Sequence, residues 1–292
     1  MSRILITGAT GFLGAHFFKL FQEKGHATFG ISTTRASDRV RLCDIENLSE
    51  VTSVLDDIRP DVVVHCAAIA SVTSSPANKY YITNVVGAEN VIQASIAVGA
   101  KRFIHISTAG VYGNQETDLL KETLCPKPVH HYGMSKFCSE RVVLNYKNDI
   151  NISIVRPFNI IGRGQNDEFI VPKLVNAFKN KQEFIKLGNI DVYRDYMDVH
   201  DGARFVYNVV NNQNSYGQIV NLCTGRAVSI RDLLQELQAL TGHEIKVSIA
   251  SEFVRKNEVW RLLGDPSKLK SLIGDDFNIV SVRNTLKDML QS

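Results

Sequence analysis

Two hydrophobic periods alternate along the first half of the chain. Short apolar runs rich in β-branched residues predict buried strands, and apolar residues spaced three or four apart predict amphipathic helices. Such strands are predicted over residues 3–7, 27–31, 40–42, 61–65, 102–107 and 152–155. Helices are predicted between them over residues 12–24, 48–58, 76–98 and 131–145. Strands that alternate with helices indicate an α/β fold, a Rossmann-type doubly wound parallel sheet with right-handed crossovers.

The second half of the chain is less regular, with helices predicted over residues 171–180, 199–211, 230–240 and 282–290. No linker rich in Pro, Gly and Ser separates the two halves. We therefore expect a small α/β substrate lobe that grows out of the carboxyl edge of the sheet. Residues 1–157, with roughly 191–222, would form the dinucleotide-binding domain, and residues 158–190 and 223–292 would form the lobe.

Composition and charge exclude several classes of protein. Of the 292 residues, 44% are hydrophobic and 22% charged, which is ordinary globular usage and excludes wholesale disorder. The 33 basic and 30 acidic residues leave a net charge of +3, which argues against a nucleic-acid partner. The five cysteines form no C-x-x-C pair, so we expect a reducing compartment and no zinc site. No apolar run approaches ~18 residues, so we expect a soluble cytoplasmic protein without a membrane span.

A glycine-rich turn follows the first predicted strand and opens the first predicted helix. Gly8 permits the tight turn, Gly11 lets the backbone approach a pyrophosphate, and Gly14 lets the helix pack close to the strand. The helix N-terminus faces the phosphate charge. The turn is therefore predicted to bind a dinucleotide through Gly8, Thr10, Gly11, Phe12, Leu13 and Gly14.

The end of the second predicted strand bears on the choice of cofactor. An acidic residue there would bind the ribose 2′-OH of NAD, but the segment 30–35 contains no carboxylate. Ser32 and Arg35 suit a 2′-phosphate, which favours NADP(H) over NAD(H). The alternative is that Arg35 is only a solvated loop charge. Asp44 and Ile45, after the third strand, are placed to meet the adenine edge.

Tyr132 and Lys136 stand four residues apart at the start of a predicted helix. Residues at this spacing share one helix face, so the ammonium would lie near the phenol. A nearby cation favours the phenolate and would lower the pKa of Tyr132 from ~10, making it a general acid or base. A hydroxyl of Ser107 or Thr108, at the end of the fifth strand, would bind the same substrate oxygen. A plain surface helix is the alternative explanation of this spacing.

Several segments, taken in order, resemble one known family. They are residues 7–14, 65–68, 84, 107–113, 132–136, 156–159, 194–198 and 221–225. Together they are similar to the extended short-chain dehydrogenase/reductases, the NAD-dependent epimerase/dehydratase-like enzymes that act mainly on nucleotide sugars. The resemblance covers almost the whole chain.

The resemblance implies roles for particular residues. Thr108, Tyr132 and Lys136 would be the catalytic triad, with Tyr132 exchanging a proton with a sugar oxygen and Lys136 binding the nicotinamide ribose. Further residues beside the cofactor would be Ala67, Ala68, Asn84 and Pro157. Residues that contact a nucleotide-diphosphate sugar would be Ser71, Thr108, Asn159, Arg194 and Arg255. A surface ion pair with Asp195 or Asp198 is the alternative for Arg194.

Assembly is also implied only by the resemblance. Members of this family commonly form homodimers by packing two long helices of each subunit into a four-helix bundle. In this chain those helices would be the predicted ones over residues 76–98 and 131–145.

Three reactions of this family compete. Dehydration is disfavoured because Ala109 and Gly110 stand where the dehydratases have an Asp-Glu pair. The 4-epimerases hold NAD tightly, and the missing second-strand carboxylate weighs against them. Residues 156–172 resemble the reductases of GDP-4-keto-6-deoxymannose, although Arg163 stands where proline is expected. CDP- and dTDP-linked 4-keto-6-deoxy sugars are alternative substrates, and a redox-sensing nucleotide-binding module is the non-enzymatic alternative.

The remaining histidines and acids have structural interpretations. His130 and His131 are sequence neighbours without metal-ligand spacing, so a turn is expected there. His65 and His105 are expected to be core residues with satisfied rings. The acidic residues around His200 are expected to cap a helix.

Overall fold

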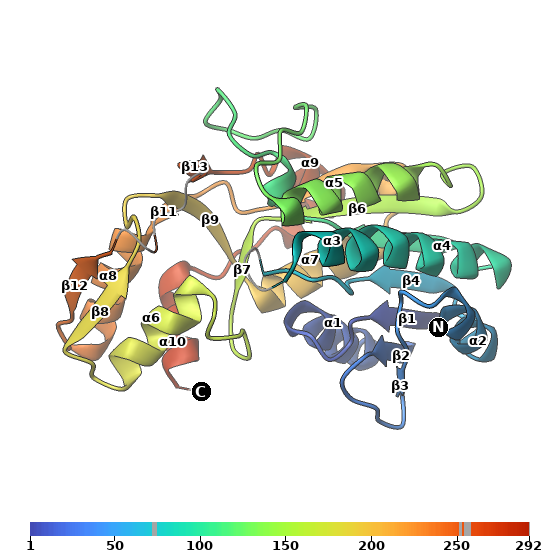
Figure 1. Cartoon of the computed structure of the whole chain (residues 1–292), viewed down its shortest axis with the longest axis horizontal. Helices are drawn as coiled ribbons and strands as arrows, with labels where there is room; N and C mark the ends of the chain where they lie inside the picture. The colour runs from blue at the N-terminus through green and yellow to red at the C-terminus, as the bar shows by residue number, and fades with distance from the viewer. Residues whose placement is uncertain (72–74, 251–252, 254–257, 292) are drawn as a thin grey trace.

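A seven-stranded parallel sheet forms the larger part of the molecule (Figure 1). It is seen in a computed structural model that describes residues 1–71, 75–250, 253 and 258–291. The strand order is β10-β6-β5-β4-β1-β2-β3, which confirms the predicted doubly wound fold. The strands are β1 (Arg3–Thr7), β2 (Ala27–Ser32), β3 (Val40–Leu42), β4 (Val62–His65), β5 (Arg102–Ile106), β6 (Asn151–Pro157) and β10 (Ile219–Leu222).

Helices cover both faces of this sheet (Figure 1). One face carries α1 (Phe12–Glu23), α7 (Val199–Asn211) and α9 (Ser267–Ile273). The other carries α2 (Leu48–Ile58), α4 (Gly87–Ala97) and α5 (His131–Leu144). The helices predicted over residues 12–24, 48–58 and 131–145 match α1, α2 and α5 to within one residue, the accuracy that helix ends allow.

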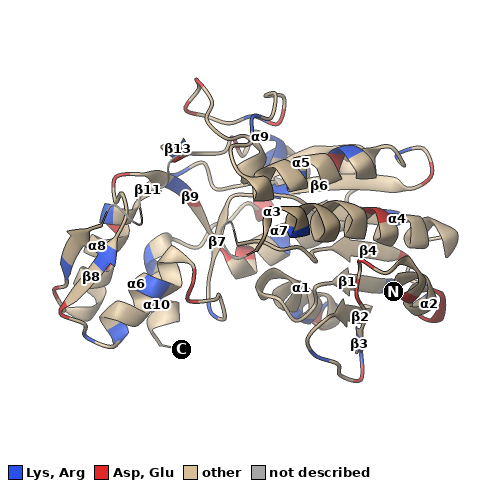
Figure 2. Ribbon diagram, viewed as in Figure 1, with Lys and Arg blue, Asp and Glu red and all other residues tan. Residues whose placement is uncertain are grey.

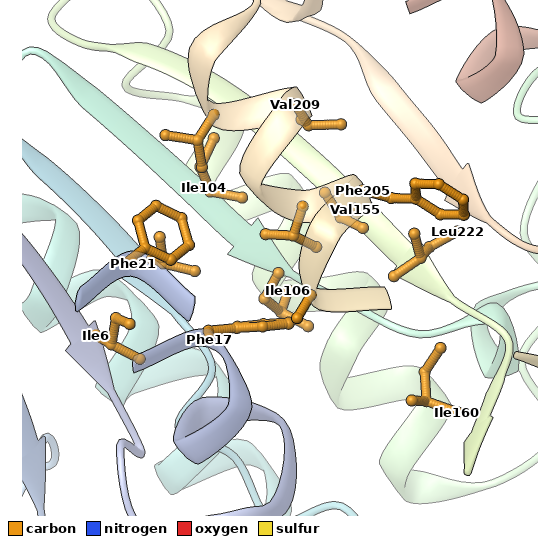
Figure 3. Close-up of a cluster of buried hydrophobic side chains, with 14 of the residues drawn as sticks. Ile6, Phe17, Phe21, Ile104, Ile106, Val155, Ile160, Phe205, Val209 and Leu222 are labelled. Atoms are coloured by element: carbon orange, nitrogen blue, oxygen red, sulfur yellow. The ribbon is translucent and has the colours of Figure 1, made fainter. Parts of the chain in front are cut away.

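Alternating side chains of the strands build two separate cores. In β1, Ile4 and Ile6 face one layer of helices, whereas Leu5 faces the other. This alternation follows from the period of two along a strand. Figure 3 shows Phe17 and Phe205, from α1 and α7, in the first of these cores. A sheet covered on both faces explains why the strands read as continuous apolar runs rather than alternating ones.

The long helix predicted over residues 76–98 is interrupted by one wider turn. It consists of α3 (Ala77–Tyr81), a π-helical turn over Ile82–Val86, and α4. Asn84 lies in this turn and is fully buried. Single π turns inside helices are frequent at functional sites. The homodimer expected through this helix and α5 stays a prediction.

A smaller lobe extends from the carboxyl edge of the sheet (Figure 1). Its strands β7 (Asn159–Ile161), β9 (Tyr193–Asp198), β11 (Ala227–Ser229) and β13 (Arg261–Leu262) form one sheet, and β8 (Phe184–Leu187) pairs with β12 (Lys246–Ile249). Its helices are α6 (Ile170–Lys179), α8 (Ile230–Thr241) and α10 (Val282–Leu290). These helices were predicted, but the short strands were not. The division into two domains at the stated boundaries stays a prediction.

Arg163, the departure from the expected proline, joins two parts of this lobe. Its Nε donates to the Asp288 carbonyl oxygen at 2.9 Å and lies 2.7 Å from the Asp288 carboxylate. The side chain therefore ties the turn after β7 to α10, a structural task that proline cannot perform.

Charge is spread over the molecule. Figure 2 shows Lys and Arg interspersed with Asp and Glu over both the sheet and the smaller lobe. Among the described residues, no helix is long and apolar enough to cross a membrane.

A buried ion pair joins α5 to the sheet. Arg156 of β6 and Glu140 of α5 are 2% and 1% exposed, and the guanidinium contacts both carboxylate oxygens at 2.9 and 2.7 Å. Ser107 donates to the same carboxylate at 2.5 Å. The guanidinium also lies over the ring of Tyr112. This bidentate, charge-assisted geometry fixes α5 relative to β5 and β6.

Glu140→Gln is expected to lower the free energy of unfolding by about 3–5 kcal/mol, because it leaves the buried Arg156 charge without compensation. The control is Glu236→Gln, which breaks an exposed pair with Arg283 and is expected to cost about 1 kcal/mol or less. Urea unfolding measures both. Equal losses in the two variants would show that Glu140 does not compensate a buried charge.

Candidate active site

The glycine turn has the shape that a dinucleotide pyrophosphate requires. Gly8 has a φ of +65°, and a Cβ there would lie 3.0 Å from the Ala67 backbone. A Cβ on Gly14 would overlap the Gly8 carbonyl oxygen. Both positions therefore require glycine. The turn places the N-terminus of α1 at the carboxyl ends of β1 and β4, so these residues fit the predicted cofactor.

The Thr7 hydroxyl organises the backbone beside this turn. Its oxygen accepts from the backbone N–H groups of Cys66 and Ala67 at 3.1 and 3.0 Å. The hydroxyl hydrogen is then available to His65 Nδ1, 2.8 Å away. This arrangement holds the loop that contains Ala67 and Ala68 against the glycine turn, where the resemblance places them.

His65 and His105 stack in the core, with ring centroids 5.5 Å apart. Burial lowers the pKa of His65 to about 3 and also lowers the pKa of His105. They are core residues, as predicted, but the prediction that their rings are satisfied was wrong. Only one nitrogen of each ring takes part in a hydrogen bond among the described residues. Among the described residues, His65 Nε2 and His105 Nδ1 have no hydrogen-bond partner.

Three hydroxyls gather where the second strand ends. Thr10 and Ser32 lie 2.6 Å apart, and the Thr34 hydroxyl lies 3.1 Å from each of them. Arg35 is exposed on the following loop and has no salt-bridge partner among the described residues. Thr34 was missed by the sequence reasoning, although a third hydroxyl in a Ser-Thr-Thr run was a visible signal.

Asp44 and Ile45, the residues predicted to meet the adenine, lie in the loop after β3. Asp44 is exposed and accepts from the Glu46 backbone at 3.0 Å. Ile45 is 4% exposed and accepts from Asn90 at its carbonyl oxygen. Both lie at the carboxyl end of β3, the edge on which the predicted adenine site depends.

Thr108, Tyr132 and Lys136 converge at the carboxyl end of β5. Thr108 follows this strand directly after Ser107, and its side chain lies close enough to the Tyr132 phenol to lower the pKa of that phenol, against the larger effect of burial. It also accepts from the Gly110 backbone at 3.0 Å. The Ser107 hydroxyl donates to Glu140 instead. The residues alone had left the two hydroxyls equivalent, and the family resemblance had implied Thr108.

The sequence predicted a lowered pKa for Tyr132, and that direction was wrong. Burial raises the pKa of Tyr132 and outweighs the lowering by Thr108. Burial also lowers the pKa of Lys136 to about 8, against the attraction of Glu140 and Cys66. Helical spacing placed the two residues on one face correctly, but it carried no information about desolvation, which disfavours the charged form of both groups.

Asn84 links two loops around Tyr132. Its Oδ1 accepts from the Ile69 backbone at 2.8 Å, and its Nδ2 donates to the Ser135 hydroxyl at 3.0 Å. Ser135 donates in turn to the Tyr132 carbonyl oxygen at 2.8 Å. The buried amide therefore holds the loop after β4 against the first turn of α5. Ser135 and Glu140 were missed, because their importance depends on partners distant in sequence.

The predicted substrate residues lie around the base of the smaller lobe. Asn159 begins β7, directly after Pro157 and Phe158, and its buried Oδ1 has no hydrogen-bond partner among the described residues. Arg194 on β9 donates to the Tyr193 carbonyl oxygen at 2.8 Å. The Asn159 amide oxygen and the Arg194 guanidinium thus come from neighbouring strands. A buried acceptor of this kind, near a guanidinium, suits a polar ligand.

Asp195 and Asp198, the alternative ion-pair partners considered for Arg194, bind other groups. Asp195 accepts from Thr224 and Gly225, and Asp198 caps α7 by accepting from the His200 backbone. The capping role expected near His200 is thus confirmed. Ser71 lies at the end of the loop after β4, and its carbonyl oxygen accepts from Tyr80 at 2.7 Å. Arg255 lies outside the described residues.

Among the described residues, no group of three His, Cys, Asp or Glu side chains could hold a metal ion.

The chain is similar to several known proteins along almost its whole length. The profile of the NAD dependent epimerase/dehydratase family matches residues 4–223. The chain is 36% identical to GDP-6-deoxy-D-talose 4-dehydrogenase of Aggregatibacter actinomycetemcomitans, over 99% of this chain and 97% of that protein. It is 27% identical to GDP-6-deoxy-D-mannose reductase of Pseudomonas aeruginosa, over 93% and 91%. The structure of RMD from Pseudomonas aeruginosa complexed with NADPH superposes with a TM-score of 0.86 at 25% identity, over 100% of this chain and 98% of that one.

The lowered pKa of Lys136 predicts that this residue destabilises the fold. Folding lowers its pKa from 10.5 to about 8, so the unfolded chain holds the proton more tightly. The penalty is complete below about pH 8 and disappears as the pH rises toward 10.5. Lys136→Met is therefore expected to raise the free energy of unfolding by about 3 kcal/mol at neutral pH.

Urea unfolding at several pH values measures this effect, with exposed Lys147→Met as the matched control. The advantage of Lys136→Met should shrink between pH 8 and 10.5. A constant or growing advantage across that window would contradict the lowered pKa.

Proposed function

Because this chain belongs to the NAD dependent epimerase/dehydratase family, we propose that it reduces the C4 keto group of a nucleotide-diphosphate 4-keto-6-deoxyhexose. NADP(H) is the favoured cofactor and GDP the favoured nucleotide. The observation that carries this proposal is the convergence of Thr108 and Tyr132, beside the buried Lys136, at the sheet edge next to the glycine turn.

The raised pKa of Tyr132 supports the reductive direction. A phenol that burial keeps protonated is a ready proton donor to a developing alkoxide. Thr108 lies near the same phenol, so its hydroxyl is placed to orient the sugar oxygen. Lys136, with a pKa of about 8, carries a positive charge at neutral pH and stabilises negative charge nearby. The nicotinamide, when bound, supplies the hydride.

The names of the relatives support a GDP-linked substrate and raise the question of stereochemistry. 6-Deoxytalose and 6-deoxymannose differ only in configuration at C4. Of the two relatives, the talose 4-dehydrogenase shares 36% identity with this chain and the mannose reductase 27%. We therefore propose that GDP-4-keto-6-deoxymannose is the substrate and that the product has the talo configuration.

The test offers GDP-, dTDP-, CDP- and UDP-linked 4-keto-6-deoxyhexoses with NADPH or NADH and follows cofactor oxidation. The GDP sugar should be reduced fastest, and proton NMR of the product should show the talo configuration at C4. Tyr132→Phe is expected to lower kcat by roughly 10²–10⁴-fold, because it removes the proton donor. Epimerisation of a simple UDP-hexose without reduction of any keto sugar would overturn the proposal.

The hydroxyl cluster and Arg35 support the preference for NADP(H). Thr10, Ser32 and Thr34 provide hydroxyl donors, and Arg35 provides a charge on the adjoining loop. Hydroxyls and a guanidinium match the oxygens of a 2′-phosphate, whereas a ribose 2′-OH would be recognised by a carboxylate.

Arg35→Gln is expected to lower kcat/KM for NADPH by roughly ten- to a hundredfold, the value of one charged hydrogen bond. The value for NADH should change little. Arg41→Gln is the matched control, since Arg41 is exposed near the same edge but pairs with Asp57. An equal effect of Arg35→Gln on both cofactors would contradict the assignment to the 2′-phosphate.

A further inference from the structure

His130 occupies an unusual place at the start of α5. It is the residue before the helix, and its Nδ1 accepts from the Gly133 backbone N–H at 2.9 Å. A turn was expected here, and the side chain instead caps the helix that carries Tyr132. The imidazole accepts this bond only with Nδ1 unprotonated, so the capping form is the neutral ring with its hydrogen on Nε2.

The same ring lies against Tyr132. The two ring planes are 14° from parallel, and their centroids are 6.0 Å apart. The usual capping residues, Ser, Thr, Asp and Asn, reach only the backbone of the first turn. Histidine at this position also places an aromatic ring beside the Tyr132 ring.

Two glycines make room for the imidazole. A Cβ added to Gly133 would lie 3.0 Å from His130 Cε1, and a Cβ added to Gly110 would lie 3.3 Å from it. Gly110 belongs to the turn whose backbone N–H donates to Thr108. The ring therefore fits between the turn that holds Thr108 and the turn that holds Tyr132.

We propose that His130 is a positioning residue, whose neutral imidazole sets the Tyr132 phenol against Thr108 for proton transfer to the substrate. The inference rests on the proposed function, because it takes Tyr132 as the proton donor. It separates two contributions of one side chain: the cap, which stabilises α5, and the ring, which orients the phenol.

The test separates these contributions with His130→Asn and His130→Ser, which keep a capping oxygen but remove the ring. Both variants are expected to retain the Tm of the wild type. Both should lower kcat by roughly ten- to a hundredfold, because small misplacements of a reacting group cost that much. KM for NADPH should be unchanged, since the glycine turn is untouched. The solvent deuterium isotope effect on kcat should rise as proton transfer becomes slower than the other steps.

His131→Asn is the matched control. The His131 ring is a neighbouring imidazole on the same helix, but it contacts the Tyr81 hydroxyl at 3.0 Å instead of Tyr132. This variant should keep kcat and the isotope effect of the wild type.

If either folded His130 variant kept the kcat and the isotope effect of the wild type, His130 would act only as a helix cap. That result would overturn the inference. A fall in Tm that accounts for the lost activity in both variants would also overturn it. Failure of the proposed function looks different, because the wild-type protein itself would then reduce no 4-keto-6-deoxyhexose.

Discussion

The ion pair between Arg156 and Glu140 holds the helix that carries Tyr132 and Lys136 in register with the sheet. Both partners are almost completely buried, and Ser107, next to Thr108 in sequence, donates to the same carboxylate. The strand end that supplies one candidate catalytic residue and the helix that supplies the other two thus meet at a single carboxylate. Because both charged groups are buried, each is stabilised only when its partner stands in this one geometry. The pair therefore fixes the position of α5 on the sheet.

The site around this pair works through desolvation. Tyr132, Lys136, His65 and His105 all have pKa values displaced toward their neutral forms. For the phenol, this displacement favours the protonated donor that reduction of a ketone needs. For Lys136, it means that the fold sustains a buried ammonium at the expense of stability. Displaced pKa values of this kind cluster where a protein carries out chemistry.

Short polar contacts then set the positions within the site. Asn84 in the π turn binds Ile69 and Ser135, Thr7 binds Cys66 and Ala67, and His130 lies between two glycines. Each contact joins segments that are distant in sequence to the loop or helix of a candidate functional residue. Such supporting contacts hold reacting groups within the small tolerances that catalysis allows.

Local sequence determined the elements that depend on neighbouring residues alone. The strands and helices of the first half follow from periodicity, and the shared face of Tyr132 and Lys136 follows from helical spacing. The glycine turn follows from conformational freedom at Gly8 and close backbone packing at Gly14. The short strands of the smaller lobe contain too few residues to show a hydrophobic period. They form because they pair with segments that are distant in sequence. Only the tertiary structure paired Ser107 with Glu140, reversed the expected pKa shift of Tyr132, and placed the His130 ring beside the Tyr132 ring. Burial and partners distant in sequence decide these properties, and neither is encoded in the spacing of residues along the chain.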